Sequence, residues 1–258
     1  MSEKPLVSIV INCFNGEKYL RQAIDSIIFQ TYKNWEIIFW DNQSTDKSAE
    51  IFNSYKDERL KYYYSTFHTK ILYEAKNFAL KKTKGEFIAF LDVDDWWMPN
   101  KLAEQIPLFN DPKVGLVYGN LFLIFEKNKK KKIYRKKTLP KGMILNELLG
   151  DYFIGSPTYV VRRKAIESLE YFFDKKFHII GDFDLNTRLA SKWKLDCIQH
   201  PVAYVRIHGQ NESLLNRNIE IEELKTWFEK NKNNPNFSIH SKLQDIPLMW
   251  SYLEIMEN

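Results

Sequence analysis

The sequence has few of the residues that define a secreted or fibrous protein. Its 258 residues include only two cysteines, Cys13 and Cys197, which cannot form a disulfide framework. Both lie in apolar stretches, so we expect two buried thiols in a reducing, cytoplasmic compartment. Glycine and proline number nine each, which excludes a collagen-like or low-complexity chain.

Long hydrophobic runs are also missing. No apolar stretch reaches the roughly 18 residues that a membrane-spanning helix needs. Residues 1–4 are polar and lead directly into a strand-like run, without the apolar segment of a signal peptide. We therefore expect a cytoplasmic protein that has no membrane span.

Several motifs of common enzyme classes do not occur. No G-x-G-x-x-G follows the first predicted strand, which argues against a dinucleotide-dependent hydride transfer. The chain also lacks the G-x-x-x-x-G-K-[ST] of a P-loop, the Cys and His spacing of a zinc site, and the G-x-S-x-G of an esterase.

Positive charge is concentrated in one segment. Residues 126–141 (EKNKKKKIYRKKTLPK) hold nine Lys and Arg and one Glu, so the net charge of +5 leaves −3 on the rest of the chain. One basic projection on a mildly acidic body argues against a broad nucleic-acid-binding face, and we expect no nucleic-acid partner. The run from Lys127 to Lys141 is either a solvated loop or a peripheral contact with an anionic membrane.

Two periodicities alternate in the first part of the chain. Short apolar runs at 6–12, 35–40, 60–64 and 87–91 predict strands, and helical patterns at 19–30, 49–55 and 72–82 lie between them. This alternation predicts an α/β fold with a doubly wound, mostly parallel sheet. Ligands bind beyond the carboxyl ends of strands in such sheets, which directs attention to residues 12–17, 41–46 and 92–95.

The pattern changes after residue 113. The apolar stretch 114–125 and the segment 133–138 predict two strands joined by the lysine-rich segment as a loop, and shorter strand-like pieces follow at 158–161 and 202–207. Beyond residue 213 the chain becomes polar and helical, with Ile221, Leu224, Trp227 and Phe228 on one face. We predict a domain over 1–213 and a helical C-terminal extension over 214–258, whose last twenty residues either form a docked helix or fray.

Three carboxylates follow the strand 87–91 without a spacer, in Asp92-Val93-Asp94-Asp95. Their mutual repulsion is tolerated where a divalent cation or strong donors neutralise it. Mg²⁺ or Mn²⁺ fits best, because such ions take oxygen ligands and share their shell with substrate phosphates. The alternative is that the carboxylates cap the following helix and bind nothing.

Three further residues at strand ends have two interpretations each. Trp96 and Trp97 directly follow the acidic cluster, and they either stack on a sugar ring or belong to the core. Asp41 follows the strand 35–40, and its carboxylate either accepts from the ring N–H of a pyrimidine base or begins an Asx-type turn.

Four segments in this order resemble the inverting family 2 glycosyltransferases, which have the GT-A nucleotide-sugar fold. They are VSIVINCFNGEKYLRQAIDSIIFQTYKNWEIIFWDNQSTDKSAEI, KGEFIAFLDVDDWWMPNKL, GDFDLNTRLA and YVRIHGQNES. The resemblance spans most of residues 6–213 and implies a Rossmann-like, GT-A type sheet. It also implies a nucleotide-sugar half over about 1–112 and an acceptor half over about 113–213.

The resemblance implies a site for a nucleotide-diphosphate sugar donor. Asp41 would bind the base, and Asp92 would lie near the ribose or the metal waters. Lys76 stands where the family often has arginine, and it keeps the charge without the guanidinium fork. The residues placed in this donor site are Cys13, Phe14, Asn15, Glu17, Asp41, Lys76, Asp92 and Val93.

Metal and base roles follow from the same resemblance. Asp94 would ligate Mn²⁺ or Mg²⁺, and His208 resembles a late histidine that in some members approaches the metal or the diphosphate; a histidine satisfied within the fold is the alternative. Asp182 occupies the position of the catalytic base, with Asp184 as a rival. The family often has Glu where this chain has Gly181.

The acceptor side is less specific. Trp96, Trp97 and Arg188 are candidates for acceptor contacts, although a structural ion pair with a nearby acid is the favoured interpretation of Arg188. No Q-x-x-R-W occurs, so the resemblance is to members that add a single sugar rather than to processive synthases.

The function implied is a metal-dependent inverting transfer of a hexosyl or N-acetylhexosaminyl group to a hydroxyl of a glycan or lipid-linked acceptor, as in polysaccharide biosynthesis. A UDP-sugar is the favoured donor, and guanine or thymine nucleotides stay open. We expect the protein in the cytoplasm, with peripheral contact at the inner face of the membrane as an extension of that expectation. The alternative is a non-catalytic nucleotide-sugar- or carbohydrate-binding protein on the same fold.

Overall fold

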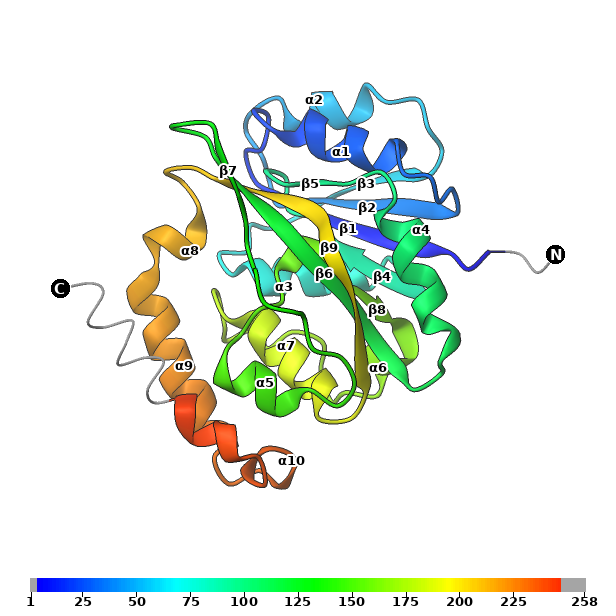
Figure 1. The fold of residues 1–258 in the computed structure, drawn as a ribbon. Helices are drawn as coiled ribbons and strands as arrows, with labels where there is room; N and C mark the ends of the chain where they lie inside the picture. The colour runs from blue at the N-terminus through cyan, green and yellow to red at the C-terminus, as the bar shows by residue number, and fades with distance from the viewer. Residues whose placement is uncertain (1–3, 247–258) are drawn as a thin grey trace.

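Strands and helices alternate through the first half of the chain in the computed structural model, which describes residues 4–246 (Figure 1). The strands are β1 (Val7–Cys13), β2 (Trp35–Asp41), β3 (Leu60–Tyr64), β4 (Phe87–Phe90), β5 (Trp96–Trp97), β6 (Val114–Phe125), β7 (Lys130–Ile133), β8 (Val160–Arg162) and β9 (Lys194–Ile207). The first four agree with the predicted strands to within one residue at either end.

The helices lie between and beyond these strands. They are α1 (Leu20–Ile28), α2 (Ser48–Asn53), α3 (Leu72–Leu80), α4 (Lys101–Gln105), α5 (Leu145–Gly150), α6 (Arg163–Glu167), α7 (Gly181–Ala190), α8 (Glu212–Leu215), α9 (Arg217–Asn231) and α10 (Pro235–Ser238), with 3₁₀ turns η1 (Ile106–Asn110), η2 (Ser156–Thr158) and η3 (Ser241–Asp245). No helix within residues 4–246 is long and apolar enough to cross a bilayer.

One sheet runs through the molecule in the order β3-β2-β1-β4-β8-β6-β9-β5, and β7 pairs with β6 outside this path. Strands β3, β2, β1 and β4 are mutually parallel. The second half is mixed, because β8 runs antiparallel to both β4 and β6 whereas β6 and β9 are parallel. The α/β class is confirmed, but only the first half of the sheet is wholly parallel. The antiparallel β8 interrupts the second half, since the chain enters β8 from the carboxyl edge through η2.

Helices cover both faces of the sheet (Figure 1). Alternate residues of β1 separate the two cores: Ile9 and Ile11 pack with α1, α2 and α4, whereas Val10 packs with the layer that contains α3, α5 and α7. Leu224 and Trp227 of α9 belong to this second core. Both faces are therefore occupied, and the loops after β1, β2 and β4 meet at the open carboxyl edge.

The lysine-rich segment differs from its prediction. The partner of β6 is Lys130–Ile133 rather than 133–138, so several lysines lie within a strand and not in a connecting loop. All four β7 residues are exposed, and within residues 4–246 β7 pairs only with β6. A lysine-rich edge strand resists pairing with other chains, which explains how so charged a segment extends a sheet. The prediction for the last twenty residues lies partly outside the description, since residues 247–258 are not described.

Candidate active site

The loops after β1 and β2 are joined by side chains that were predicted to bind the donor. Asn15 Oδ1 accepts from the backbone N of Thr45 at 2.8 Å, and Glu17 Oε2 accepts from Lys47 N at 3.0 Å. Asn15 adopts a positive φ of 55°. These two side chains therefore shape the loop, while Phe14 is 52% exposed and its ring contacts His68 at 4.6 Å between centroids.

Both cysteines are buried and free, as predicted. Cys13 faces the loop after β2, where Ser44 Oγ donates to its Sγ at 3.7 Å, and burial raises the pKa of the thiol. The side chain of Cys13 thus packs against the buried side of the loop after β2.

Asp41 is completely buried at the end of β2. Its Oδ1 accepts from Ser44 N at 2.7 Å, which forms the Asx-type turn considered above, and its Oδ2 accepts from the Tyr62 hydroxyl at 2.6 Å. A carboxylate has about four lone-pair sites, so two of them remain for a base. Both interpretations of Asp41 are therefore compatible with this geometry.

Asp92 forms an ion pair with a buried lysine. Lys76 Nζ lies 3.3 Å from Asp92 Oδ1, and only 2% of Lys76 is exposed. Burial opposes the charge of Lys76, but the carboxylates of Asp92 and Asp182 raise its pKa above the ordinary value. Lys76 consequently stays cationic and links the acidic loop after β4 electrostatically to Asp182 on α7.

Asp94 and His208 face each other. His208 Nε2 lies 3.0 Å from Asp94 Oδ2. Burial and the charge of Asp92 raise the pKa of Asp94, while His208 opposes that shift. Between them the two side chains offer a carboxylate oxygen and an imidazole nitrogen at one point of the carboxyl edge.

The third carboxylate of the cluster faces inward. Asp95 is 6% exposed and accepts from Arg206 N at 3.0 Å, and burial raises its pKa well above the ordinary value. Val93 packs against Gly16, where an added Cβ would lie 3.1 Å from the valine side chain. The loops after β1 and β4 are therefore in direct contact.

Asp182 lies in the first turn of α7, where the helix dipole favours negative charge. Its Oδ1 accepts from the hydroxyl of Tyr159 at 2.6 Å. Tyr159 is fully buried between η2 and β8, and burial with the charge of Asp182 raises its pKa well above the ordinary value. This tyrosine was missed by the sequence analysis, because nothing local distinguishes it from a core residue.

The presence of Gly181, where the family often has Glu, has a steric explanation. A Cβ at this position would collide with the ring of Tyr73, which packs against the start of α7 from α3. A longer side chain, as the family often has there, would displace either this ring or the first turn of α7. Glycine is thus required by the close approach of two helices.

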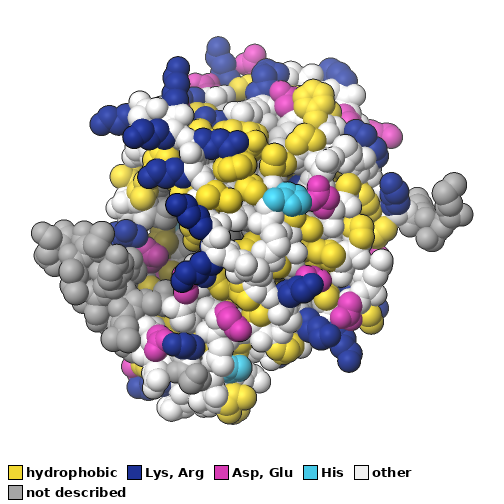
Figure 2. Space-filling view, viewed as in Figure 1, with side chains coloured by type: hydrophobic (Ala, Val, Ile, Leu, Met, Phe, Trp, Pro, Cys, Tyr) yellow, Lys and Arg dark blue, Asp and Glu magenta, His cyan; other side chains and the backbone are white. Residues whose placement is uncertain are grey.

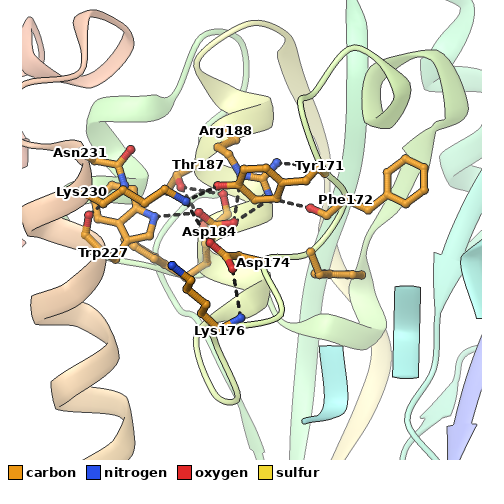
Figure 3. A network of polar contacts seen from close by, with 12 residues as sticks. Tyr171, Phe172, Asp174, Lys176, Asp184, Thr187, Arg188, Trp227, Lys230 and Asn231 are labelled. Atoms are coloured by element: carbon orange, nitrogen blue, oxygen red, sulfur yellow. Dashed lines mark hydrogen bonds and ion pairs between the residues drawn. The ribbon is translucent and has the colours of Figure 1, made fainter. Parts of the chain in front are cut away.

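Asp184, the rival base, is part of a buried network (Figure 3). It is 1% exposed, its Oδ1 accepts from Trp227 Nε1 at 3.0 Å, and its Oδ2 accepts from Arg188 at 2.7 and 2.9 Å. Arg188 also donates to the carbonyls of Tyr171 and Phe172. This corrects the expected acceptor contact of Arg188, because its guanidinium is used inside the fold, and it leaves Asp184 in a structural role.

The two tryptophans after the acidic cluster lie in different environments. Trp97 is 2% exposed, donates from Nε1 to Pro157 O at 2.8 Å, and is a core residue, which corrects its expected acceptor role. Trp96 is half-buried, stacks on Tyr204 at 4.9 Å and lies under the guanidinium of Arg206. Its ring is consequently engaged with other side chains of the protein.

A second residue missed by the sequence analysis is Asn12. It is 8% exposed at the end of β1, and within the described part of the chain neither its Oδ1 nor its Nδ2 has a hydrogen-bond partner. Trp40, opposite Asn12 on β2, likewise lacks a partner for Nε1. Buried polar groups are nearly always bonded, so these atoms indicate space for a polar ligand or water. An asparagine within an apolar strand is the signal that would have found it.

The side chains of Asp94 and His208 can supply only part of the coordination shell of a divalent cation. Among residues 4–246, no group of three or more His, Cys, Asp or Glu side chains is arranged to hold a metal ion. Asp94 and His208 supply two donors at 3.0 Å from each other. This is the donor set of an ion that takes its remaining ligands from water and substrate phosphates.

A family model described as "Glycosyl transferase family 2" matches residues 8–169, more than half of the chain. The chain is 34% identical over 171 residues to the Escherichia coli protein WfgD, a "UDP-Glc:alpha-D-GlcNAc-diphosphoundecaprenol beta-1,3-glucosyltransferase", covering 66% of each. Alignments with three curated relatives span between 47% and 66% of their lengths.

Solved structures share the fold. Staphylococcus aureus TarS 1-349 in complex with UDP-GlcNAc superposes with a TM-score of 0.69 at 19% identity, covering 96% of this chain and 79% of that one. The Pyrobaculum calidifontis mannosyltransferase PcManGT, in complex with GDP-Man and Mn²⁺, gives 0.72 at 16% identity, covering 98% and 72%. The GT-A expectation for the fold is therefore confirmed.

Proposed function

Since the chain belongs to glycosyl transferase family 2, we propose that it transfers a sugar from a nucleotide-diphosphate donor, a UDP-sugar, to a hydroxyl of a glycan or lipid-linked acceptor, with inversion at the sugar carbon. One observation carries this proposal: the Asp92–Lys76 pair, the Asp94–His208 pair and Asp182 converge at the carboxyl edge of one sheet. A buried lysine needs carboxylate partners in any fold. The position of this group at the edge where ligands bind in α/β sheets is what supports a functional site.

The donor occupies the carboxyl edge between β2 and β4 in this proposal. Asp41 accepts from the base through its remaining lone pairs, and Asp92 lies by the ribose. Lys76 adds a fixed positive charge, and the unpaired amide of Asn12 supports a polar ligand at the same edge. Phe14, Asn15 and Glu17 form the loop against which the nucleotide packs.

Asp94 and His208 are the residues that would hold Mg²⁺ or Mn²⁺. A bound cation supplies charge stabilisation for the departing diphosphate. The two side chains reach this point from the ends of β4 and β9, far apart in sequence, so the sheet itself sets their separation.

Asp182 acts as the general base and takes the proton of the acceptor hydroxyl at its carboxylate as the new bond forms. General-base assistance contributes about 10²–10⁴-fold. The hydrogen bond from Tyr159 orients the carboxylate and leaves Oδ2 for the incoming hydroxyl. Attack opposite the diphosphate converts an α-linked donor into a β product.

The β6–β7 hairpin supports a peripheral contact with the inner face of the cytoplasmic membrane. Figure 2 shows Lys and Arg side chains gathered among hydrophobic ones at the upper left, where Figure 1 places this hairpin. Lys131 Nζ lies 3.7 Å from the ring centroid of Phe122. Each basic residue near an anionic surface contributes about 1 kcal/mol, so several together hold the protein at lipid-linked acceptors.

The decisive experiment combines binding with transfer. A thermal-shift panel of UDP-, GDP- and dTDP-sugars with and without Mn²⁺ should show stabilisation by a UDP-sugar, and that donor should then support transfer to a lipid-diphosphate saccharide. Donor binding without transfer or hydrolysis would instead identify a non-catalytic binding protein.

Co-sedimentation with anionic liposomes tests the membrane contact by comparing the wild type with a variant in which the hairpin lysines are replaced by Ser. The proposed membrane contact is wrong if both forms sediment equally.

A further inference from the structure

Helix α9 presents three side chains on one face toward a single segment. Glu223, Trp227 and Lys230 are spaced at i, i+4 and i+7, and their side chains form hydrogen bonds with residues between 171 and 184. This segment contains the start of α7 and therefore Asp182. The region matched by the family model ends at residue 169, so α9 and the segment 171–184 both lie beyond it.

Glu223 binds the backbone directly before α7. One carboxylate accepts from three successive amides, those of His178, Ile179 at 2.9 Å and Ile180 at 3.0 Å. Glu223 is only 8% exposed. The amides before and at the first turn of a helix have no intrahelical acceptor, and a buried carboxylate bonds them more strongly than water does.

Trp227 and Lys230 fix the segment at two further points. Trp227 is fully buried, donates from Nε1 to Asp184 Oδ1 at 3.0 Å, and packs edge-on against Phe183. Lys230 Nζ lies 2.8 Å from the Tyr171 hydroxyl and 2.9 Å from Asp174 Oδ2. Figure 3 shows these contacts arriving from α9 on one side of α7.

Asp182 lies between the fixed points. It follows Ile180 by two residues and precedes Asp184 by two, and both neighbours are bonded to α9. Tyr159 holds its carboxylate from the other side, at 2.6 Å. Displacement of the first turn of α7 would move the carboxylate relative to an acceptor bound elsewhere, whereas the donor residues Asp41 and Asp92 lie at the ends of β2 and β4.

We propose that α9 positions the catalytic base, with Glu223 as the positioning residue that sets the start of α7. The proposal rests on the proposed function, since it gives Asp182 the role of base. A misplacement of about 1 Å in a reacting group costs on the order of 10²-fold in rate. Loss of Glu223 should therefore lower kcat and leave the affinity for the donor unchanged.

The test compares Glu223→Ala, Glu223→Gln and the control Glu222→Ala in the full chain. Glu222 is on the same helix, but its carboxylate accepts from Lys225, one turn further along α9. We expect kcat to fall about 10- to 100-fold in Glu223→Ala. Glu223→Gln should lower kcat by a smaller factor, because its amide keeps one acceptor oxygen for the backbone N–H groups. Some loss of kcat should remain, because the amide NH₂ group faces a backbone N–H that has lost its acceptor.

The affinity for UDP, measured by calorimetry, should stay within about twofold of the wild type in all three variants. Hydrogen exchange at the amides of residues 178–180 should become faster in both Glu223 variants and stay unchanged in Glu222→Ala. A kcat for Glu223→Gln equal to that of Glu222→Ala would overturn the proposal, as would a parallel loss of kcat and UDP affinity. If Glu223→Ala does not fold, Glu223→Gln decides alone.

The same measurements separate this proposal from the proposed function. A wild-type protein that transfers no sugar, or an Asp182→Asn variant that keeps full activity, contradicts the function itself. An active wild type and an inactive Asp182→Asn variant, together with an unimpaired Glu223→Gln variant, contradict only the positioning by α9.

Discussion

The hydroxyl of Tyr159 donates a hydrogen bond of 2.6 Å to Oδ1 of Asp182 and so connects the start of β8 with the first turn of α7. Tyr159 is fully buried, so this hydroxyl has little water as an alternative acceptor. The contact joins the sheet to the helix that carries the proposed base, and it gives the base one fixed oxygen and one oxygen for a substrate.

Replacing Tyr159 by Phe should therefore impair catalysis with little effect on donor binding. A hydrogen bond to a charged group contributes about 1.5–3 kcal/mol, so we expect kcat to fall at least about tenfold. Steady-state kinetics and UDP calorimetry measure the two effects separately. An unchanged kcat would mean that Tyr159 supports the fold alone.

Asp182 and Asp184 should respond differently to the same substitution. Asp182→Asn removes the general base, so transfer should fall about 10²–10⁴-fold while the loss of stability stays smaller than in Asp184→Asn. Asp184→Asn breaks a buried ion pair with Arg188, which costs about 3–5 kcal/mol of stability. Urea unfolding and transfer assays on both variants provide the comparison, and normal turnover in Asp182→Asn would return Asp184 to consideration.

Gly181 and Tyr73 should be energetically coupled. Gly181→Ala places a methyl group against the Tyr73 ring, and overpacking of this kind costs about 1–3 kcal/mol. In the double variant with Tyr73→Ala the methyl group finds space, so the two free energies of unfolding should not add. A double-mutant cycle measures the coupling, and simple additivity would show that the helices approach less closely.

Removal of divalent metal should abolish transfer. EDTA is expected to inactivate the protein, and added Mn²⁺ or Mg²⁺ should restore activity, because Asp94 and His208 supply only part of a coordination shell. Asp94→Asn should weaken the effect of Mn²⁺ on the affinity for the UDP-sugar, measured by calorimetry with and without the ion. Activity that is indifferent to EDTA is incompatible with this metal site.

Lys101 predicts a pH dependence of stability. It is 1% exposed, its Nζ donates to Gln105 Oε1 at 2.7 Å, and burial lowers its pKa well below the ordinary value. Between the lowered pKa of the folded state and the ordinary pKa of the unfolded state, the unfolded chain binds more protons, so stability rises with pH in that window. Below it, the cost of burying the charge is present in full.

The Lys101→Met variant lacks this titration. The difference in unfolding free energy between the wild type and the variant should therefore shift in favour of the wild type as the pH rises from 7 to 10. Urea unfolding at several pH values measures it, and a difference that does not change with pH would contradict the assigned protonation. The unpaired Gln105 oxygen lowers the stability of the variant equally at every pH.

The strand ends were predictable because local pattern is enough to place them. Short β-branched runs separated by helical periodicities have one common solution, a sheet with helices on both faces, and its carboxyl edge follows from that topology. Asp92, Asp94 and Asp41 could be assigned to this edge from sequence position alone. The choice between Asp182 and Asp184 could not, because both lie in the first turn of the same helix.

The partners of those residues depend on contacts between distant segments. Sequence position gives no information on which of two neighbouring carboxylates meets Arg188 and Trp227, or that a tyrosine before β8 reaches α7. The role of Trp97 was undecided for the same reason. The sequence shows a large ring after the acidic loop, and only packing decides that this ring is in the core. The lysine-rich strand was misplaced because its pairing is set by the register with β6.

The sequence by itself determined the order of strands and helices in the first half of the chain, the family and the edge at which acidic side chains gather, because these follow from periodicity and from motifs in a fixed order. The tertiary structure alone decided which carboxylate stays open to a substrate, why residue 181 must be glycine and how α9 reaches the start of α7. Those outcomes depend on contacts between side chains that are tens of residues apart in the sequence. Local propensities and periodicity act over a few neighbouring residues, so they do not predict such contacts.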